Sequence, residues 1–112
     1  MPGKSWVFPE LLNAVKAAAD EKRLEIMGLL YEKPGMTLYE IQRAIGDSRP
    51  QTTLKRLNVL MKGALVDQYT ENFGSPNMIP KYRLTIIGRK MLEGLVNAFV
   101  PLELVRKQLR NL

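Results

Sequence analysis

Along most of this chain, apolar residues recur every three or four positions, the spacing that gathers side chains on one side of a helix. The first stripe follows Pro9 and predicts a helix over residues 9–19. Its apolar members are Leu11, Leu12, Val15, Ala18 and Ala19. A second stripe begins after Asp20, a suitable N-cap, and ends before Pro34 and Gly35. Its apolar members are Leu24, Met27, Leu30 and Tyr31.

Two short helices are predicted next, in close succession. Thr37 and Glu40 have the spacing of a capping box, and Gly46 suits the left-handed residue that ends a helix. Ser48 and Gln51 repeat the capping-box spacing and predict a second helix over residues 48–63. Because only a Gly-Asp-Ser step separates these helices, they are predicted to form a helix-turn-helix.

The segment 48–63 has an apolar side and a polar, basic side, and it contains no acidic residue. At about 100° per residue, the positions that face a core are Thr53, Leu57, Leu60 and Met61, with Leu54 at their edge. The opposite side and its flanks consist of Gln51, Thr52, Lys55, Arg56, Asn58, Val59 and Lys62. Amide, hydroxyl, ammonium and guanidinium groups are those that hydrogen-bond base edges and neutralise phosphates. The pattern therefore predicts a DNA-recognition helix, with a merely solvated charged face as the alternative.

After residue 63 the pattern changes to a period of two, which predicts strands over residues 64–69 and 79–84. The segment between them, residues 72–77, is rich in turn-forming residues and predicts a long hairpin tip. Thr85 is then a suitable cap for a helix that runs to about Val100, where Pro101 predicts a kink or a break.

An apolar stripe in residues 86–112 predicts an interface with a second copy of the chain. A core built from the preceding elements is complete by about Leu95, so the later apolar residues need another partner. Symmetric dimers are the commonest soluble oligomers. The predicted interface residues are Trp6, Phe8, Leu95, Phe99, Leu102, Val105 and Leu109. The alternative is a stripe that folds back on its own core.

The net charge of +6 favours an anionic partner without choosing between nucleic acid and membrane. Residues 1–47 hold six basic and seven acidic residues, a net charge of −1, whereas residues 48–112 hold eleven and four, a net charge of +7. The positive charge therefore begins with the basic helix. The 112 residues fit a single domain.

The chain has no cysteine and no histidine. This excludes disulfides, zinc fingers and nucleophilic catalysis by Ser-His-Asp or Cys-His groups. The carboxylates are scattered and form no catalytic pair, so we expect neither an enzyme nor a cofactor. Because there is no apolar run of about 20 residues and no signal-peptide pattern, we expect a cytoplasmic protein without a membrane partner.

The order of these elements resembles the winged helix-turn-helix of small prokaryotic regulators of the ArsR, MarR and PadR type, especially compact dimeric relatives common in archaea. The segments that carry the resemblance are RLEIMGLL (Arg23–Leu30), TLYEIQRAIG (Thr37–Gly46), TTLKRLNVLMKGALV (Thr52–Val66) and YRLTIIGRKMLE (Tyr82–Glu93). Ala64 departs from the glycine usual in these families, and Leu54 from a small polar residue. Without cysteine or histidine, this chain cannot sense soft metals through thiolate or imidazole ligands.

The resemblance implies an α+β, mostly helical fold: a three-helix core, a β-hairpin wing, and terminal helices at a dimer interface. It implies that the recognition helix, residues 49–62, binds in the major groove of double-stranded DNA, with the wing, residues 70–81, on the flanking backbone or minor groove. The expected contacts are Arg49, Gln51, Thr52, Lys55, Arg56, Asn58, Lys62, Asn72, Ser75, Asn77 and Lys81. Asn72, Ser75 and Asn77 are equally well explained as turn formers.

The predicted function is sequence-specific DNA binding by a homodimeric transcriptional regulator. Gln51, Thr52 and Lys55, near the start of the helix, are expected to contact base edges, while Lys62 and Lys81 are expected to contact phosphates. Two alternatives stay open: an architectural protein that binds DNA without sequence preference, and a winged helix that binds another protein.

Overall fold

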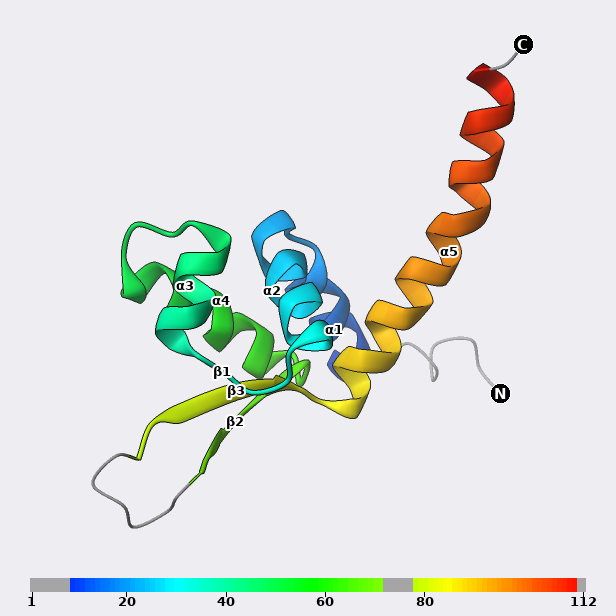
Figure 1. The fold of residues 1–112 in the computed structure, drawn as a ribbon. Coiled ribbons are helices and arrows are strands. Elements are labelled where there is room, and N and C mark those ends of the chain that lie inside the picture. The colour runs from blue at the N-terminus through cyan, green and yellow to red at the C-terminus, as the bar shows by residue number, and fades with distance from the viewer. Residues whose placement is uncertain (1–8, 72–77, 111–112) are drawn as a thin grey trace.

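The computed structural model describes the backbone of residues 9–71 and 78–110, with the side chains of this part except those of 99–106 and 108–110. Its elements follow in the order α1 (Pro9–Ala18), α2 (Glu21–Glu32), β1 (Met36–Thr37), α3 (Leu38–Ile45), α4 (Pro50–Lys62), β2 (Val66–Thr70), β3 (Pro80–Leu84) and α5 (Ile86–Arg110). The small sheet lies against one side of the helices, and α5 leaves the body of the molecule (Figure 1). The predicted α+β, mostly helical fold is confirmed.

Most of the predicted helix ends are confirmed. The Asp20 carboxylate accepts the Arg23 N–H at 3.0 Å at the start of α2. Both hydrogen bonds of the Thr37–Glu40 capping box are present at the start of α3, and Gly46 ends that helix with φ +77°. Each of these groups satisfies a backbone donor or acceptor that the helix itself leaves without a partner.

The predicted start of α4 is wrong. The helix begins at Pro50, and Arg49 is its N-cap without a side-chain capping bond, so Ser48 and Gln51 form no capping box. Proline disfavours helical backbone angles in the residue before it, and Arg49 accordingly is extended, with φ −133° and ψ 140°. Pro50 itself suits the first turn, where its missing N–H has no intrahelical partner.

The sheet is antiparallel with the strand order β1-β3-β2. In the hairpin, Val66 pairs with Leu84 and Thr70 with Pro80. On the other side of β3, Met36 pairs with Tyr82. Both predicted strands are confirmed with later starts. For β2 the reason is Ala64, which is left-handed, with φ +61°, and turns the chain before the strand. Sequence reasoning missed β1, whose two residues are too few to show any period.

The core lies between the sheet and helices α2, α3 and α4. Its fully buried side chains are Ile26, Met27, Leu30, Ile41, Leu57, Leu60, Leu65 and Thr53. Leu57, Leu60 and Thr53 were predicted as the inward side of the basic helix. Tyr82 of β3 closes the core from the sheet.

The predicted helix is confirmed as α1, but most of its apolar stripe is not its buried side. Ala14, Ala17 and Ala18 are buried, whereas Leu11, Leu12 and Val15 are 42%, 46% and 50% exposed. The reason is the close approach of α1 to the end of α4, where a Cβ at Gly63 would lie 2.7 Å from the Cβ of Ala17. Small side chains are the ones that fit such a contact, so the alanines face inward and the larger residues outward.

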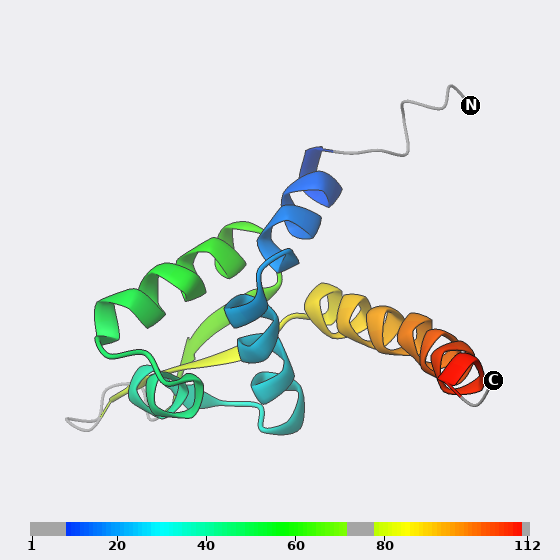
Figure 2. The same ribbon diagram turned by 90° about the horizontal axis from the view of Figure 1, so that it is seen from above.

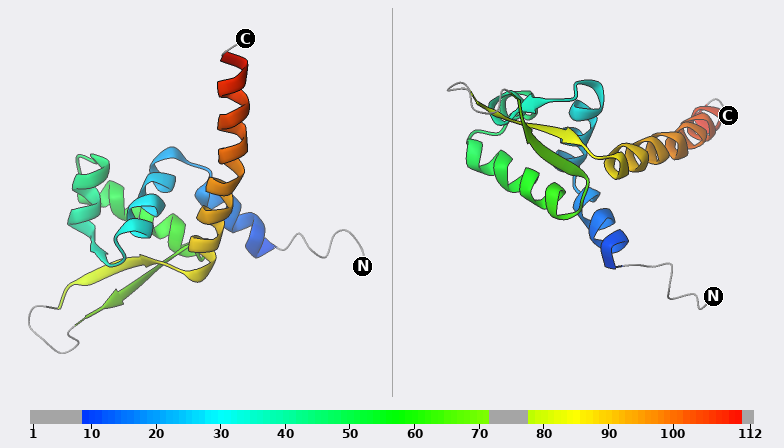
Figure 3. Two further views of the ribbon diagram at one scale, coloured as in Figure 1. Left: turned by 45° about the vertical axis from the view of Figure 1, so that its right-hand side comes forward. Right: turned by 90° about the horizontal axis from the view of Figure 1, so that it is seen from below.

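Helix α5 continues through Pro101, so the predicted break is wrong. Proline removes one backbone hydrogen bond, and the helical turns on either side of it continue. Only the first part of α5 packs on the core, through Met91 and Leu92. Its remainder extends away from α3 and α4 (Figures 2 and 3). Within residues 9–71 and 78–110, no helix combines the length and apolar character needed to cross a membrane.

Candidate nucleic-acid interface

Helix α4 is held by its buried side and presents a polar side to solvent. Its buried residues, Thr53, Leu57 and Leu60, point into the core. The predicted contact residues that are exposed on this helix or just before it are Arg49, Gln51, Lys55, Asn58 and Lys62. Thr52 is half-buried. The structure therefore brings the predicted polar residues together on one outward surface.

Two apolar residues interrupt this polar surface. Leu54 is 36% exposed and Val59 is 39% exposed. Neither side chain has a polar group to hydrogen-bond a base edge, but an apolar side chain in the major groove can contact the methyl group of thymine. The outward side of α4 thus carries both polar and apolar side chains along its length.

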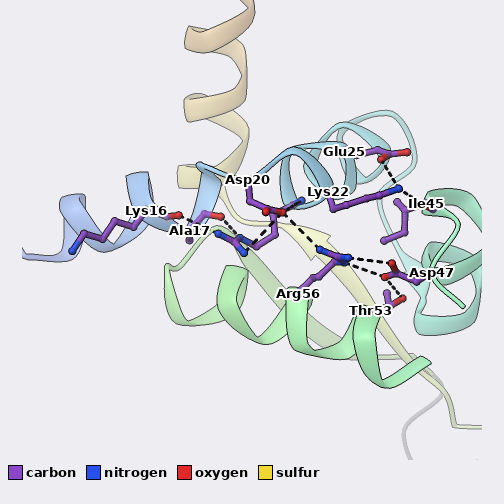
Figure 4. A network of polar contacts seen from close by, with 10 residues as sticks. Lys16, Ala17, Asp20, Lys22, Glu25, Ile45, Asp47, Thr53 and Arg56 are labelled. Atoms are coloured by element: carbon purple, nitrogen blue, oxygen red, sulfur yellow. Dashed lines mark hydrogen bonds and ion pairs between the residues drawn. The ribbon is translucent and has the colours of Figure 1, made fainter. Parts of the chain in front are cut away.

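Arg56 differs from the other predicted contacts because its guanidinium group is directed into the protein (Figure 4). Its Nε–H donates to Oδ2 of Asp47 at 3.1 Å, and Nη2 donates to Oδ1 of the same carboxylate at 3.3 Å. Its Nη1 lies 3.8 Å from Oδ2 of Asp20, the N-cap of α2. Arg56 therefore ties α4 to the helix-turn-helix turn and to α2. This geometry gives Arg56 a structural role, and its DNA contact stays a prediction from the sequence.

Asp47, in the turn between α3 and α4, is the centre of this network. Its side chain is only 6% exposed, and it also accepts a hydrogen bond of 2.8 Å from the Thr53 hydroxyl. Burial alone raises the pKa of such a carboxyl, but the hydrogen bonds from Arg56 and Thr53 and the charges of Arg56 and Lys22 outweigh it. The pKa of Asp47 is therefore lower than its ordinary value, and the network is charged at neutral pH.

Near this network, two further basic side chains donate hydrogen bonds to carbonyl groups at the C-terminal ends of helices. Arg23 donates from Nε to the Ala17 carbonyl at 2.6 Å and from Nη2 to the Lys16 carbonyl at 3.3 Å, both at the end of α1. Lys22 donates to the Ile45 carbonyl at 2.6 Å at the end of α3. Positive charge at a helix C-terminus is favourable. Sequence reasoning missed both, because the partners lie on other helices.

The hairpin carries its own ion pairs. Arg83 lies 3.3 Å from Asp67 across the strands, and its guanidinium carbon lies 4.4 Å from the centre of the Tyr69 ring. Lys81, a predicted phosphate contact, pairs with Glu71 at 3.3 Å. Exposed pairs of this kind contribute at most about 1 kcal/mol, so Lys81 can exchange its carboxylate for a phosphate. Asn72, Ser75 and Asn77 lie outside the described residues.

Solved structures of bacterial regulators have the same arrangement of elements. A homodimeric winged helix-turn-helix DNA-binding domain from Mycobacterium bovis, described as a possible ArsR-family transcriptional regulator, is 24% identical, with 93% of this chain and 94% of that chain covered and a TM-score of 0.71. A MarR-family regulator from Enterococcus faecalis is 20% identical over 88% and 87% of the two chains, with a TM-score of 0.77. S. aureus MepR, solved with DNA, is 20% identical over 89% and 80%, with a TM-score of 0.71.

This chain has the winged helix-turn-helix fold. No protein-family model matches it, and neither does any curated protein. In the winged helix, α2, α3 and α4 form the three-helix core, and β2 and β3 form the wing. The resemblance in the sequence thus predicted the fold correctly.

Of the predicted dimer residues, the structure describes the side chain of Leu95 alone. Leu95 is 38% exposed on α5. Trp6 and Phe8 lie outside the described residues, as do the side chains of Phe99, Leu102, Val105 and Leu109. Next to Leu95, an apolar groove of about 320 Å³ runs between α1 and α5; its other lining residues are Val15, Ala18, Ala19, Leu24 and Met91. The groove thus includes three members of the apolar stripe predicted after Pro9, namely Val15, Ala18 and Ala19.

Proposed function

We propose that this chain is a homodimeric transcriptional regulator that binds double-stranded DNA sequence-specifically, with α4 in the major groove. The observation that carries the proposal is the outward side of α4, which has no acidic residue and exposes Gln51, Lys55, Asn58 and Lys62 on the second helix of a helix-turn-helix. The DNA-bound state of S. aureus MepR, which has the same fold, supports this reading.

The position of each side chain along α4 suggests its role. Gln51 and Lys55 lie in the first half of the helix, the part that reaches base edges in helix-turn-helix proteins, so we assign base contacts to them. Lys62 in the last turn and Arg49 before the first are assigned to phosphates. Lys81 is retained as a phosphate contact of the wing, and Asn72, Ser75 and Asn77 stay predictions from the sequence.

The dimer part of the proposal rests on apolar residues that the described chain leaves exposed. Leu11 and Leu12 of α1 and Leu95 and Val96 of α5 are each at least 38% exposed, and the apolar groove runs between these helices. The M. bovis domain of the same fold is described as homodimeric. A two-fold dimer would separate the two copies of α4 by about one turn of DNA, roughly 34 Å. Leu95→Asp is expected to shift the protein toward monomer in sedimentation, and an unchanged mass would contradict this interface.

The test of DNA binding is a fluorescence anisotropy titration with duplexes selected from random sequence by the purified protein. Lys55→Ala with Lys62→Ala is expected to lower affinity more than tenfold, whereas Lys90→Ala with Lys107→Ala removes the same charge from exposed positions on α5 and serves as the control. The structure favours this pair over Arg56, which is engaged inside the protein. Equal affinities of the two double variants would refute the role of α4.

Sequence readout has a separate test. Gln51→Ala is expected to reduce the preference for the selected duplex over a random one by about 1–3 kcal/mol for each half-site, the discrimination of one bidentate base contact per subunit. Equal affinity of the native protein for both duplexes would instead indicate an architectural DNA-binding protein. An absence of binding at low salt would indicate a protein-interaction module. We further propose that the chain is not an enzyme and acts in the cytoplasm.

A further inference from the structure

A second cationic surface lies beside α4, along its border with α1 and α2. Two hollows of about 490 Å³ and 250 Å³ adjoin there and share Arg23 and Val59 in their lining. One wall is a single stripe of α4, with Thr52, Lys55, Val59 and Lys62 at steps of three, four and three residues. We call the two hollows together the α1–α4 trough.

The opposite wall of the trough comes from α1 and the start of α2. Asn13 and Lys16 of α1 and Arg23 of α2 line it, and the small residues Ala17 and Gly63 line the end where the two helices meet. The two parts of this wall are tied together, because Arg23 is hydrogen-bonded to the carbonyl groups of Lys16 and Ala17. Figure 4 shows this end of α1, with Lys16 and Ala17, beside the network.

The trough is positive along its whole length. Lys16, Arg23, Lys55, Arg56 and Lys62 line it, and no carboxylate does. The nearby Asp20 already faces Arg23 at 3.9 Å and Arg56 at 3.8 Å. Among the described residues, the three lysines have no salt-bridge partner. Lys16 and Lys62 are thus free to bind phosphates, while Lys55, at the border between the trough and the outward side of α4, keeps the base contact proposed for it.

The length of the trough suits a chain of phosphates better than a single small anion. The stripe from residue 52 to residue 62 spans about 15 Å at 1.5 Å per residue. A DNA strand presents one phosphate about every 3.4 Å along the helix axis. Several consecutive nucleotides can therefore lie along this wall while the outward side of α4 is in the major groove.

We propose that the α1–α4 trough binds the sugar–phosphate backbone of duplex DNA that flanks the bases read by α4, with Lys16 of α1 as a phosphate contact. The proposal rests on the proposed DNA-binding function and extends the DNA contact onto a helix outside the helix-turn-helix and wing. A phosphate contact carries no sequence information, so the contribution of Lys16 is the same for every duplex sequence.

The test compares the salt dependence of DNA affinity for Lys16→Gln with that for Lys90→Gln, a matched loss of charge on the exposed side of α5. Each subunit of the proposed dimer loses one phosphate contact, so the slope of log affinity against log salt falls by about 1.8, and the advantage of the native protein over Lys16→Gln shrinks about 12-fold between 50 and 200 mM salt. Lys90→Gln leaves the slope unchanged, and Lys16→Arg keeps the native slope. The reduction is the same with selected and random duplexes.

Duplex length gives the second readout. As the selected duplex is shortened from its ends, the effect of Lys16→Gln disappears while the effect of Gln51→Ala persists. A Lys16→Gln slope equal to the native slope overturns the trough as a backbone site, even if DNA binding and the Gln51 effect are intact. An equal Lys16 effect on single-stranded DNA of the same length also overturns it, because the trough would then hold any phosphodiester strand. If the native protein binds no DNA, the proposed function itself has failed.

Discussion

Replacing Arg56 with methionine is expected to destabilise the fold, because it removes the cationic partner of a buried carboxylate. Methionine keeps much of the apolar stem of the side chain, so the change acts mainly on charge and hydrogen bonding. In the variant, Asp47 would keep the Thr53 hydroxyl as its one remaining side-chain donor among those the structure describes. A carboxylate that is 6% exposed cannot recover this loss fully from water.

The size of the effect follows from burial. Removing one partner of a fully buried ion pair costs about 3–5 kcal/mol. The Arg56 side chain is 25% exposed, so water can enter the vacated space and solvate Asp47 in part. We therefore expect the free energy of unfolding to fall by about 2–3 kcal/mol. Lys55→Met, one residue earlier on the exposed side, is the matched control and is expected to stay within about 0.5 kcal/mol of native.

The assay is urea denaturation followed by circular dichroism, at one protein concentration because a dimer's stability depends on it. The pH dependence adds a second signature. The lowered pKa of Asp47 gives a contribution to stability that is present above the ordinary carboxyl pKa and is lost as pH falls through the native pKa. The difference between native and Arg56→Met is therefore largest at neutral pH and shrinks in acid.

Two results would refute this reasoning. The first is an Arg56→Met variant as stable as Lys55→Met. The second is a DNA affinity whose salt slope falls by about 1.8 in Arg56→Met, the change expected when each subunit of the dimer loses one phosphate contact. The double variant with Asp47→Asn is expected to regain part of the lost stability, because asparagine leaves no buried charge without a partner.

Three further predictions concern backbone conformation and capping, each measured by urea denaturation. Ala64→Gly is expected to raise the free energy of unfolding by about 0.5–1 kcal/mol. The left-handed φ of +61° is strained for alanine, and this strain exceeds the extra chain entropy that glycine loses on folding. A loss of stability would contradict this prediction. Thr37→Ala is expected to cost about 1 kcal/mol through the lost cap of α3, and a neutral effect would show that the cap is dispensable. Hydrogen bonds from the Thr37 backbone and the Lys33 side chain hold the pKa of Glu40 at about 2, below its ordinary 4.5, so its stabilisation is present above pH 4.5 and lost toward pH 2. Glu40→Gln should lack this acid-dependent loss.

The features that sequence reasoning predicted well are local. The period of three and four in residues 48–63 correctly separated the buried Thr53 and Leu57 from the exposed Gln51 and Lys55, since a helix places residues by spacing alone. Caps could also be predicted, because the side chain that satisfies a free N–H lies within three residues of it. The helix starts at Pro50 and not after Ser48 for an equally local reason: proline restricts the backbone of the preceding residue, Arg49, to extended angles.

The features that were missed depend on distant partners. Leu11 and Val15 are more hydrophobic than Ala14 and Ala17, so the spacing of apolar residues alone would turn Leu11 and Val15 inward. The contact with Gly63, more than forty residues later, leaves room only for small side chains on that face. The same contact explains why α1 presents its larger apolar residues to the groove next to α5, where the proposed dimer would cover them.

Lys55 and Arg56 show that the residue types on a helix do not by themselves determine which basic side chains are available to bind DNA. They are adjacent, equally charged at neutral pH and equally compatible with an outward, acid-free helix side. Asp47 and Asp20, nine and thirty-six residues earlier, engage Arg56, whereas Lys55 has no salt-bridge partner among the described residues. The DNA-binding potential of a basic helix is therefore set by the cations that the fold leaves without partners. By that measure the proposed surface loses Arg56 from α4 and gains Lys16 from α1.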